Sequence, residues 1–294
     1  MTTETATDVF EEHRPVLMGV AYRMLGRVAD AEDVVQDAWL RWSGADRSEV
    51  REPRGYLVRV TTRLAIDRLR AAQTRKESYV GPWLPEPYVT DFGDAVADTA
   101  ERAVLADSVS LAVMVVLESL SPLERAVFVL REAFGYPFAE IATVLDRGES
   151  AVRQLAARAR RHVDERRPRY EVDPAERRDL TERFLAAAGG GDFEGLMSLL
   201  APGVRLVGDS GGLSKAPLRV LETPDKVGRF LAAVAENGVP DPAFRLLEVN
   251  GGLAVLVLSG GKPDSLVQLD VADGRIQCVY IVRNPQKLGS LPTA

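Results

Sequence analysis

Residues 138–163 read FAEIATVLDRGESAVRQLAARARRHV, and this stretch decides the fold of the first half of the chain. Apolar residues recur at helical spacing over 138–145, and a short turn containing Gly148 separates them from a second helical pattern. The second pattern, which starts at Glu149, is strongly basic. Two helices joined by a tight turn, the second of them basic, are typical of a helix-turn-helix, which places its second helix in a DNA groove.

The second helix of this pair is predicted to have one apolar and one polar face. Its apolar stripe consists of Val152, Leu155, Ala156, Ala159 and Val163. Arginine suits guanine edges, glutamine suits adenine edges and outer arginines bind phosphates, so the polar face fits DNA. The candidate contact residues are Ser150, Arg153, Gln154, Ala157, Arg158 and Arg161. The residues alone leave an ordinary basic surface helix as the alternative.

Most of the sequence before about residue 170 also has helical periodicity. Asp30 is expected to cap one helix, with Asp33 at the capping-box position, and Ser121 with Glu124 forms a second capping box. The polar and proline-rich stretch from about 76 to 98 interrupts the helices. The first half is therefore predicted to be all helical.

The composition limits the classes of protein to consider. The chain has 294 residues, of which 46% are apolar and 27% charged, which predicts a soluble protein of two or three compact units. It has no apolar run of about 18 residues and no signal core, so we expect a cytoplasmic protein without membrane contact. One cysteine and two histidines argue against a disulfide, a metal site and histidine-based catalysis, and we expect no cofactor.

The net charge of −6 argues against nucleic acid when it is taken alone. However, basic residues concentrate in two segments, 51–76 and 147–169. Clustered charge, rather than total charge, creates a binding surface for a polyanion. Because of these two basic segments, the negative net charge does not exclude DNA binding.

From about residue 176 the pattern changes. A helix, a glycine-rich turn and another helix precede six short β-like runs, and the turns at 250–252 and 272–275 are hairpin signals. Helices followed by a meander of strands indicate an α+β domain with a curved antiparallel sheet.

Three segments of the first half resemble one family. YRMLGRVADAEDVVQDAWLRW, PRGYLVRVTTRLAIDRLR and FAEIATVLDRGESAVRQLAARARR are similar to regions 2 and 4 of extracytoplasmic-function sigma factors of the sigma-70 family. The resemblance implies a promoter-specificity subunit that does no chemistry itself. Its implied partners are promoter DNA and the RNA polymerase core, through the β′ clamp helices and the β subunit.

The same resemblance assigns two further sites in region 2. The DAEDVVQD helix would dock on the β′ clamp helices through Asp33, Gln36 and Asp37, whose acidic character suits a basic partner. The VRVTTRLAIDRLR helix and the loop before it would read and melt the −10 element. The candidate residues are Arg47, Arg51, Arg59, Arg63, Asp67 and Arg70.

The C-terminal half resembles the SnoaL-like branch of the nuclear-transport-factor-like superfamily, a cone of helices and curved sheet. WLPEP at 83–87 and NPQKL at 284–288 resemble the signature of sigma factors with such a tail, the sigma-factor-J type. That subgroup has an Asp-Gly-Gly-Gly-Lys element, which is altered and lengthened here over 208–215. The tail is expected to regulate activity in cis, so that no dedicated anti-sigma factor is needed.

An enzymatic or ligand-sensing tail is the alternative, because the superfamily includes isomerases and polyketide cyclases. The tail has no histidine, and the residues that could line a pocket are Asp209, Lys215 and Tyr280. No spacing singles out a catalytic pair, so we expect no enzyme and leave a small ligand of the tail open.

The linker GPWLPEPYV, residues 81–89, is stiff and apolar, which predicts a docked segment. We expect its Trp83, Leu84 and Pro85 to pack on the tail near Asn284, Pro285 and Leu288, and so to clamp the two helical domains. The predicted divisions are region 2 at 1–76, the linker at 77–107, region 4 at 108–168 and the regulatory domain at 176–291.

Overall fold

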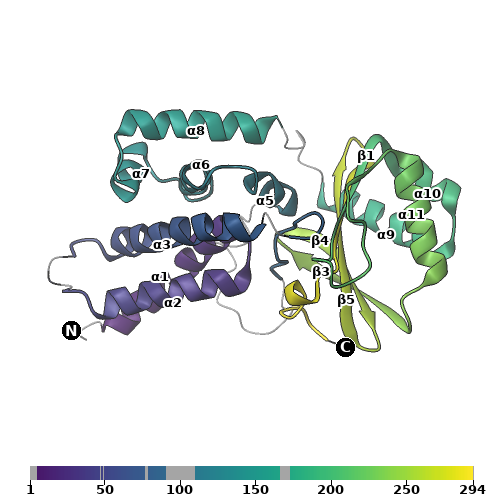
Figure 1. Cartoon of the computed structure of the whole chain (residues 1–294), viewed down its shortest axis with the longest axis horizontal. Coiled ribbons are helices and arrows are strands. Elements are labelled where there is room, and N and C mark those ends of the chain that lie inside the picture. The colour runs from purple at the N-terminus through teal and green to yellow at the C-terminus, as the bar shows by residue number, and fades with distance from the viewer. Residues whose placement is uncertain are drawn as a thin grey trace. The chain divides into compact units, whose positions relative to one another are not determined.

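The computed structural model describes residues 5–46, 48, 50–76, 79–90, 110–165 and 173–293, without the side chains of 72–76. The chain forms two compact units, which are described separately (Figure 1). Unit 1 comprises Met1–Glu77 and Phe92–Arg167, and unit 2 comprises Ser78–Asp91 and Pro168–Ala294. Within the described ranges, no helix has the length and apolar character needed to cross a membrane.

Unit 1 begins with three helices that pack on one another: α1 (Ala6–Leu25), α2 (Val28–Ser43) and α3 (Pro53–Lys76). The helix α2 starts at Val28 with Arg27 as its N-cap, so the prediction that Asp30 caps it is wrong. The reason is a tertiary contact, because the Asp30 carboxylate accepts hydrogen bonds from Arg68 of α3 at 2.9 and 3.2 Å.

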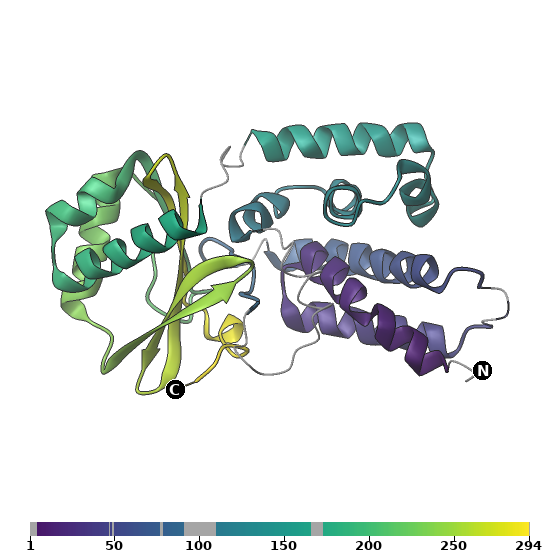
Figure 2. The ribbon, with the colours of Figure 1, turned by 180° about the vertical axis from the view of Figure 1, so that it is seen from behind.

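The second half of unit 1 contains α5 (Leu111–Leu117), α6 (Pro122–Phe128), the π-helical turn η2 (Val129–Ala133), α7 (Phe138–Leu145) and α8 (Glu149–Asp164). The predicted capping box between Ser121 and Glu124 is present at the start of α6. Asp146, at φ 53°, ends α7 in the left-handed region, and Gly148 is the N-cap of α8. The predicted helix-turn-helix is therefore formed. Both views show α6 and α7 between α8 and α3 (Figures 1 and 2).

Unit 2 contains a six-stranded sheet of order β2-β1-β6-β5-β4-β3. Its strands are β1 (Leu200–Asp209), β2 (Leu221–Glu222), β3 (Pro242–Val249), β4 (Gly252–Ser259), β5 (Lys262–Ala272) and β6 (Arg275–Val282). Both predicted hairpin turns are present, with positive φ at Asn250-Gly251 and Asp273-Gly274. However, β1 pairs with β6 in parallel, so the sheet is mixed and the expected purely antiparallel sheet is wrong for this pair. A local hydrophobic pattern identifies a strand but not its partner, which is why this pair was missed.

Three helices cover one face of this sheet: α9 (Pro174–Gly190), α10 (Phe193–Leu199) and α11 (Pro224–Asn237) (Figures 1 and 2). The apolar core between helices and sheet includes Leu180, Phe184, Leu206, Val227 and Val279. The sequence analysis did not anticipate α11. The other side of the sheet holds the linker, residues 79–90, and the short 3₁₀ helix η3 (Pro285–Lys287).

Candidate functional site

The helix α8 has the two faces that its sequence predicts. Of the predicted apolar stripe, Val152, Ala156, Ala159 and Val163 are buried, whereas Leu155 is only half-buried. All of the expected DNA-contacting residues are exposed, namely Ser150, Arg153, Gln154, Ala157, Arg158 and Arg161. A helix with a continuous exposed stripe of arginine and glutamine can present hydrogen-bond donors to base edges and phosphates.

Two of these arginines are held by weak surface contacts. Arg153 donates to Glu149 at 2.5 Å and lies 4.8 Å from the ring centroid of Phe138, and Arg158 donates to Glu124 at 2.9 Å. Burial works to raise the pKa of Glu124, but hydrogen bonds from Ser121 and Arg158 outweigh it and lower that pKa. Both arginine side chains remain 60% exposed, and such pairs contribute about 0–1 kcal/mol, so DNA phosphates can displace them.

The expected −10-reading residues, which belong to α3 and to the loop before it, do not share one environment. Arg51 is exposed, and Asp67 and Arg70 form a surface ion pair at 3.4 Å. The Arg59 guanidinium lies 5.5 Å from the centroid of the Tyr56 ring. Arg63 contacts the helix-turn-helix half of unit 1, because its Nε donates a hydrogen bond to the Val144 carbonyl at 2.9 Å. Arg47 lies outside the described residues.

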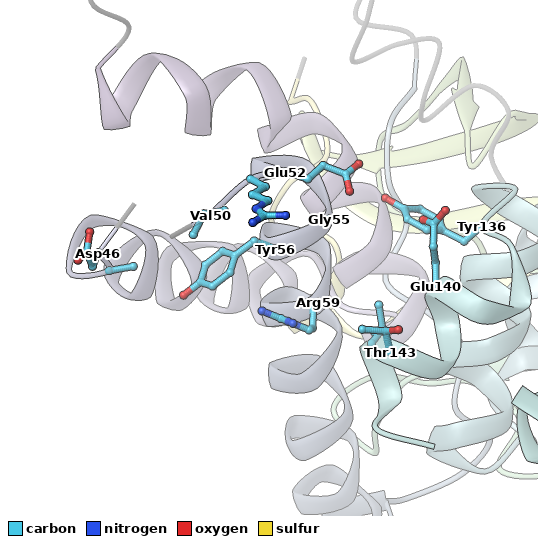
Figure 3. Close-up of a pocket in the computed structure, with 12 residues that line it drawn as sticks. Asp46, Val50, Glu52, Gly55, Tyr56, Arg59, Tyr136, Glu140 and Thr143 are labelled. Carbon is cyan, nitrogen blue, oxygen red and sulfur yellow. The ribbon is translucent and has the colours of Figure 1, made fainter. Parts of the chain in front are cut away.

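A cavity of about 550 Å³ adjoins this part of α3. Figure 3 shows Tyr56 and Arg59 on one wall and Tyr136, Glu140 and Thr143, from the helix-turn-helix half, on the other. Aromatic rings and arginines around a cavity can stack on and neutralise a nucleotide that has left a base stack.

The expected polymerase-docking residues lie on the outer face of α2. Gln36 and Asp37 are exposed. Asp33 is not a free charge, because Arg68 donates to its carboxylate at 2.5 Å and also binds Asp30. The sequence analysis missed Arg68, whose long-range partners could not be identified from helical spacing alone.

A buried ion pair holds the linker on unit 2. Nζ of Lys287 lies 2.6 Å from Oδ2 of Asp209, and it also donates to the Leu84 carbonyl at 2.5 Å. The Leu84 amide donates to the same carboxylate oxygen at 2.8 Å, and the Leu84 side chain is fully buried. Three segments that are far apart in the sequence, the linker, the end of β1 and η3, therefore meet at this carboxylate.

Two aromatic side chains of the linker complete this site. The Tyr79 hydroxyl donates to the second oxygen of Asp209, and it accepts a hydrogen bond from Asn284 at 2.8 Å. The Lys287 ammonium lies 3.2 Å from the ring centroid of Trp83, a close cation–π contact. Tyr79, Trp83, Leu84, Asp209, Asn284 and Lys287 are named the linker lock below.

Backbone geometry also favours the linker lock. Gly211 has φ 59°, and a Cβ there would lie 2.7 Å from Asn284 and 2.9 Å from the Tyr79 hydroxyl. The linker is attached a second time at the edge of β3, where Val89 forms an antiparallel bridge with Val249 and the Asn250 amide donates to the Tyr88 carbonyl at 2.9 Å. The linker is thus held at both ends.

The structure places the other linker and tail residues as follows. Pro85, Asn284 and Leu288 are buried, whereas Pro285 is exposed. The residues expected to line a tail pocket do not form one group: Asp209 belongs to the linker lock, Tyr280 is buried on β6 and Lys215 is exposed. The lysine that binds Asp209 is Lys287, which the sequence analysis did not single out although it lies in the NPQKL stretch.

A second polar group lies in the strands of unit 2. Burial raises the pKa of Asp270 to about 6, although the nearby Arg177 opposes this shift. Asp270 faces Cys278 across the β5–β6 pair, and burial raises the pKa of that thiol to about 12. Burial also raises the pKa of Tyr280. Among the described residues, no cluster of three His, Cys, Asp or Glu side chains could hold a metal ion.

Comparison with known proteins agrees with this architecture. The family model for Sigma-70 region 2 matches residues 9–75, and that for Sigma-70 region 4 matches residues 110–163. The chain is 40% identical to the ECF RNA polymerase sigma factor SigJ of Mycobacterium tuberculosis, over 96% of this chain and 93% of that protein. It is 34% identical to the probable ECF sigma factor SigI of the same species, over 95% of this chain and 93% of the relative.

The fold is also similar to a solved structure. The crystal structure of Mycobacterium tuberculosis SigJ matches with a TM-score of 0.76 and 37% identity, over 95% of this chain and 96% of that one. These matches include the C-terminal unit as well as both helical regions. The chain therefore belongs to the extracytoplasmic-function sigma factors of the sigma-70 family, in the SigJ-like group that carries a C-terminal α+β domain.

Proposed function

We propose that this chain directs RNA polymerase to promoters whose −35 element is read by α8 and whose −10 element is read by α3. The exposed arginine and glutamine stripe of α8 supports the first assignment, and the basic face of α3 supports the second. Gln36 and Asp37, exposed on α2, would dock on the polymerase core with Asp33 beside them. A subunit of this kind works where polymerase and DNA are, in the cytoplasm.

We further propose that the C-terminal domain controls the sigma factor in cis. The observation that carries this proposal is the buried pair between Lys287 and Asp209, which holds the chain between α3 and α5 through Leu84. A segment that joins two DNA-reading regions limits their separation when it is bound elsewhere. Because the restraint is built into the chain, a separate anti-sigma factor is not required.

Run-off transcription with core polymerase tests this control. We would compare the full chain with a chain ended near Asp173, and with Lys287→Met. Lys215→Met is the matched control, since it removes one exposed lysine of the same domain. Both changes that release the linker should alter promoter-specific transcription several-fold, and the control should not. Equal activity of all four proteins would show that the C-terminal domain does not regulate transcription under these conditions.

Catalysis or ligand sensing by the C-terminal domain is the second candidate. Asp270 favours it, because a carboxyl group with a pKa of about 6 suits a general acid or base. Its neighbour Cys278 does not help, since a thiol with a pKa of about 12 is a poor nucleophile near pH 7. We therefore propose a regulatory domain without chemistry, and Asp270→Asn should leave transcription control intact.

A further inference from the structure

The cavity beside α3 is built by both helical halves of unit 1. Region 2, helices α1–α3, contributes Tyr56 and Arg59, and region 4, helices α5–α8, contributes Tyr136, Glu140 and Thr143 (Figure 3). Arg59 is one of the residues proposed to bind the melted −10 strand. Region 4 thus stands directly opposite the −10-reading surface.

Arginines cross this boundary at three places. Nε of Arg63 donates to the Val144 carbonyl at 2.9 Å. The Arg54 guanidinium lies 5.9 Å from the centroid of the Tyr136 ring. Nε of Arg125 donates to the Arg23 carbonyl at 2.9 Å.

The third contact is the most enclosed. The Arg125 side chain is 2% exposed and pairs with Glu118 at 3.0 Å. A buried guanidinium that loses its partners is strongly destabilising, so this contact stabilises the closed arrangement of the two regions. Arg63 ties the two regions together as well, because its Nε is used by the Val144 carbonyl, which fixes the direction of the guanidinium while its terminal nitrogens stay exposed.

Within the described residues of unit 1, the proposed −35-reading surface is exposed. Arg153 and Arg158 on α8 are 60% exposed, and α6 and α7 lie between α8 and α3 (Figures 1 and 2). Within unit 1, region 4 therefore faces Arg59 and contacts Arg63, whereas the α8 surface and the outer −10 candidates Arg51, Asp67 and Arg70 are exposed.

We propose that region 4 covers the part of the −10-reading surface around Arg59 and Arg63, so that single-stranded −10 DNA and the segment 136–144 compete for this part of α3. This inference rests on the proposed −10 role of α3. Single-stranded DNA must first separate the two regions, and its apparent affinity falls by the fraction of molecules that are open.

Fluorescence anisotropy with a labelled degenerate 12-nucleotide single strand and a labelled degenerate duplex tests the competition on the full chain. Tyr136→Ala removes the contact with Arg54 without changing the charge, and should raise single-strand affinity severalfold, up to a limit of about tenfold if one molecule in about ten of the native chain is open. Duplex affinity should change by less than about twofold, because α8 is exposed in both states. Unchanged single-strand affinity in a variant with a native thermal unfolding curve overturns the proposal.

A second pair of variants, matched in charge, keeps the proposal testable if Tyr136→Ala does not fold. Glu140→Ala changes the cavity wall, whereas Glu132→Ala removes an equal charge from a surface pair with Arg160. Only the first should raise single-strand affinity beyond the general effect of one lost negative charge. Equal increases for both variants overturn the proposal.

Hydrogen–deuterium exchange on the unaltered chain gives an independent measurement. Peptides covering residues 129–145 should exchange faster when single-stranded DNA is saturating, since their cover on α3 has been replaced. Slower or unchanged exchange there overturns the proposal.

Two further variants separate this inference from the proposed function. Arg59→Ala and Arg70→Ala should weaken single-strand binding if α3 reads the −10 strand. If neither does, the proposed −10 surface fails and the covering idea fails with it. If both do while Tyr136→Ala leaves the affinity unchanged, only the covering idea fails.

Discussion

Lys287 and Asp209 form an ion pair at 2.6 Å whose side chains are only 2% and 0% exposed. Desolvation opposes such a pair, so its net contribution to stability depends on the hydrogen bonds around it. Here the Leu84 amide, the Leu84 carbonyl and the Tyr79 hydroxyl supply those bonds. The pair is therefore stable mainly when the linker is bound.

Removal of one partner of this pair should be costly. Lys287→Met leaves the Asp209 carboxylate buried without its cation, which typically lowers the free energy of unfolding by about 3–5 kcal/mol. Urea unfolding and protease cleavage within 79–90 measure the effect, and Lys215→Met is the control. A Lys287→Met protein as stable as the control would contradict the role of the pair.

Gly211 should not tolerate a side chain. Alanine there would combine an unfavourable positive φ with contacts of 2.7 and 2.9 Å to Asn284 and Tyr79, and we expect a loss of about 1–3 kcal/mol. Gly203→Ala, in β1 and with open space around it, should cost little. Thermal unfolding of the two variants distinguishes them, and equal melting temperatures would show that the linker does not need this close approach.

The free energy of unfolding should depend on pH because the Asp270 carboxyl group has a raised pKa in the folded state. Burial raises its folded pKa to about 6, above the ordinary value of 3.8 for an aspartate, so the folded state favours the protonated form. This stabilisation is complete below pH 3.8 and is lost as the pH rises toward 6 and beyond. Asp270→Asn should therefore be more stable than the native chain by about 2–3 kcal/mol at pH 7, and nearly equal to it near pH 3.5. Urea titrations at both pH values test this, and a pH-independent difference would contradict it.

The −35 assignment predicts different effects for different arginines of α8. Arg153→Ala and Arg158→Ala should weaken promoter-specific transcription by about 1–3 kcal/mol and relax sequence preference, because each removes a base contact. Arg161→Ala should weaken binding to all sequences alike, as the loss of a phosphate contact does. Arg178→Ala, an exposed arginine of α9, is the control. Unchanged transcription and unchanged sequence preference in both Arg153→Ala and Arg158→Ala would contradict the proposal that α8 reads the −35 element.

Local sequence signals predicted the helix-turn-helix, the Ser121 capping box and both hairpin turns, because each depends on neighbouring residues alone. Long-range pairings were not predictable in this way. The parallel β1–β6 pair and the Arg68 contact with Asp33 join residues that no periodicity connects. The helix α11 has a local signal, with Pro224 at its start and Val227 and Leu231 spaced for burial, but this signal is short and lies between two β-like runs.

Among the site residues too, those defined by local spacing were predictable and those defined by long-range contacts were not. The exposed face of α8 follows from helical spacing, so its residues could be chosen from the sequence. The environment of Asp209 depends on Tyr79, Leu84 and Lys287, which are brought together only by the folded sheet and the docked linker. The predicted pocket role of Asp209 therefore does not fit its environment, because Tyr79, Leu84 and Lys287 already occupy its carboxylate oxygens.

The buried position of Cys278 has a practical consequence for measuring motion. Its thiol is inside the sheet domain with a pKa of about 12, so maleimide dyes should leave it unmodified near pH 7. Two cysteines introduced on exposed positions, one in region 2 and one in region 4, can then carry a donor and an acceptor in the otherwise native chain. Single-molecule energy transfer between them would follow the separation of the regions in real time, without first removing the natural thiol.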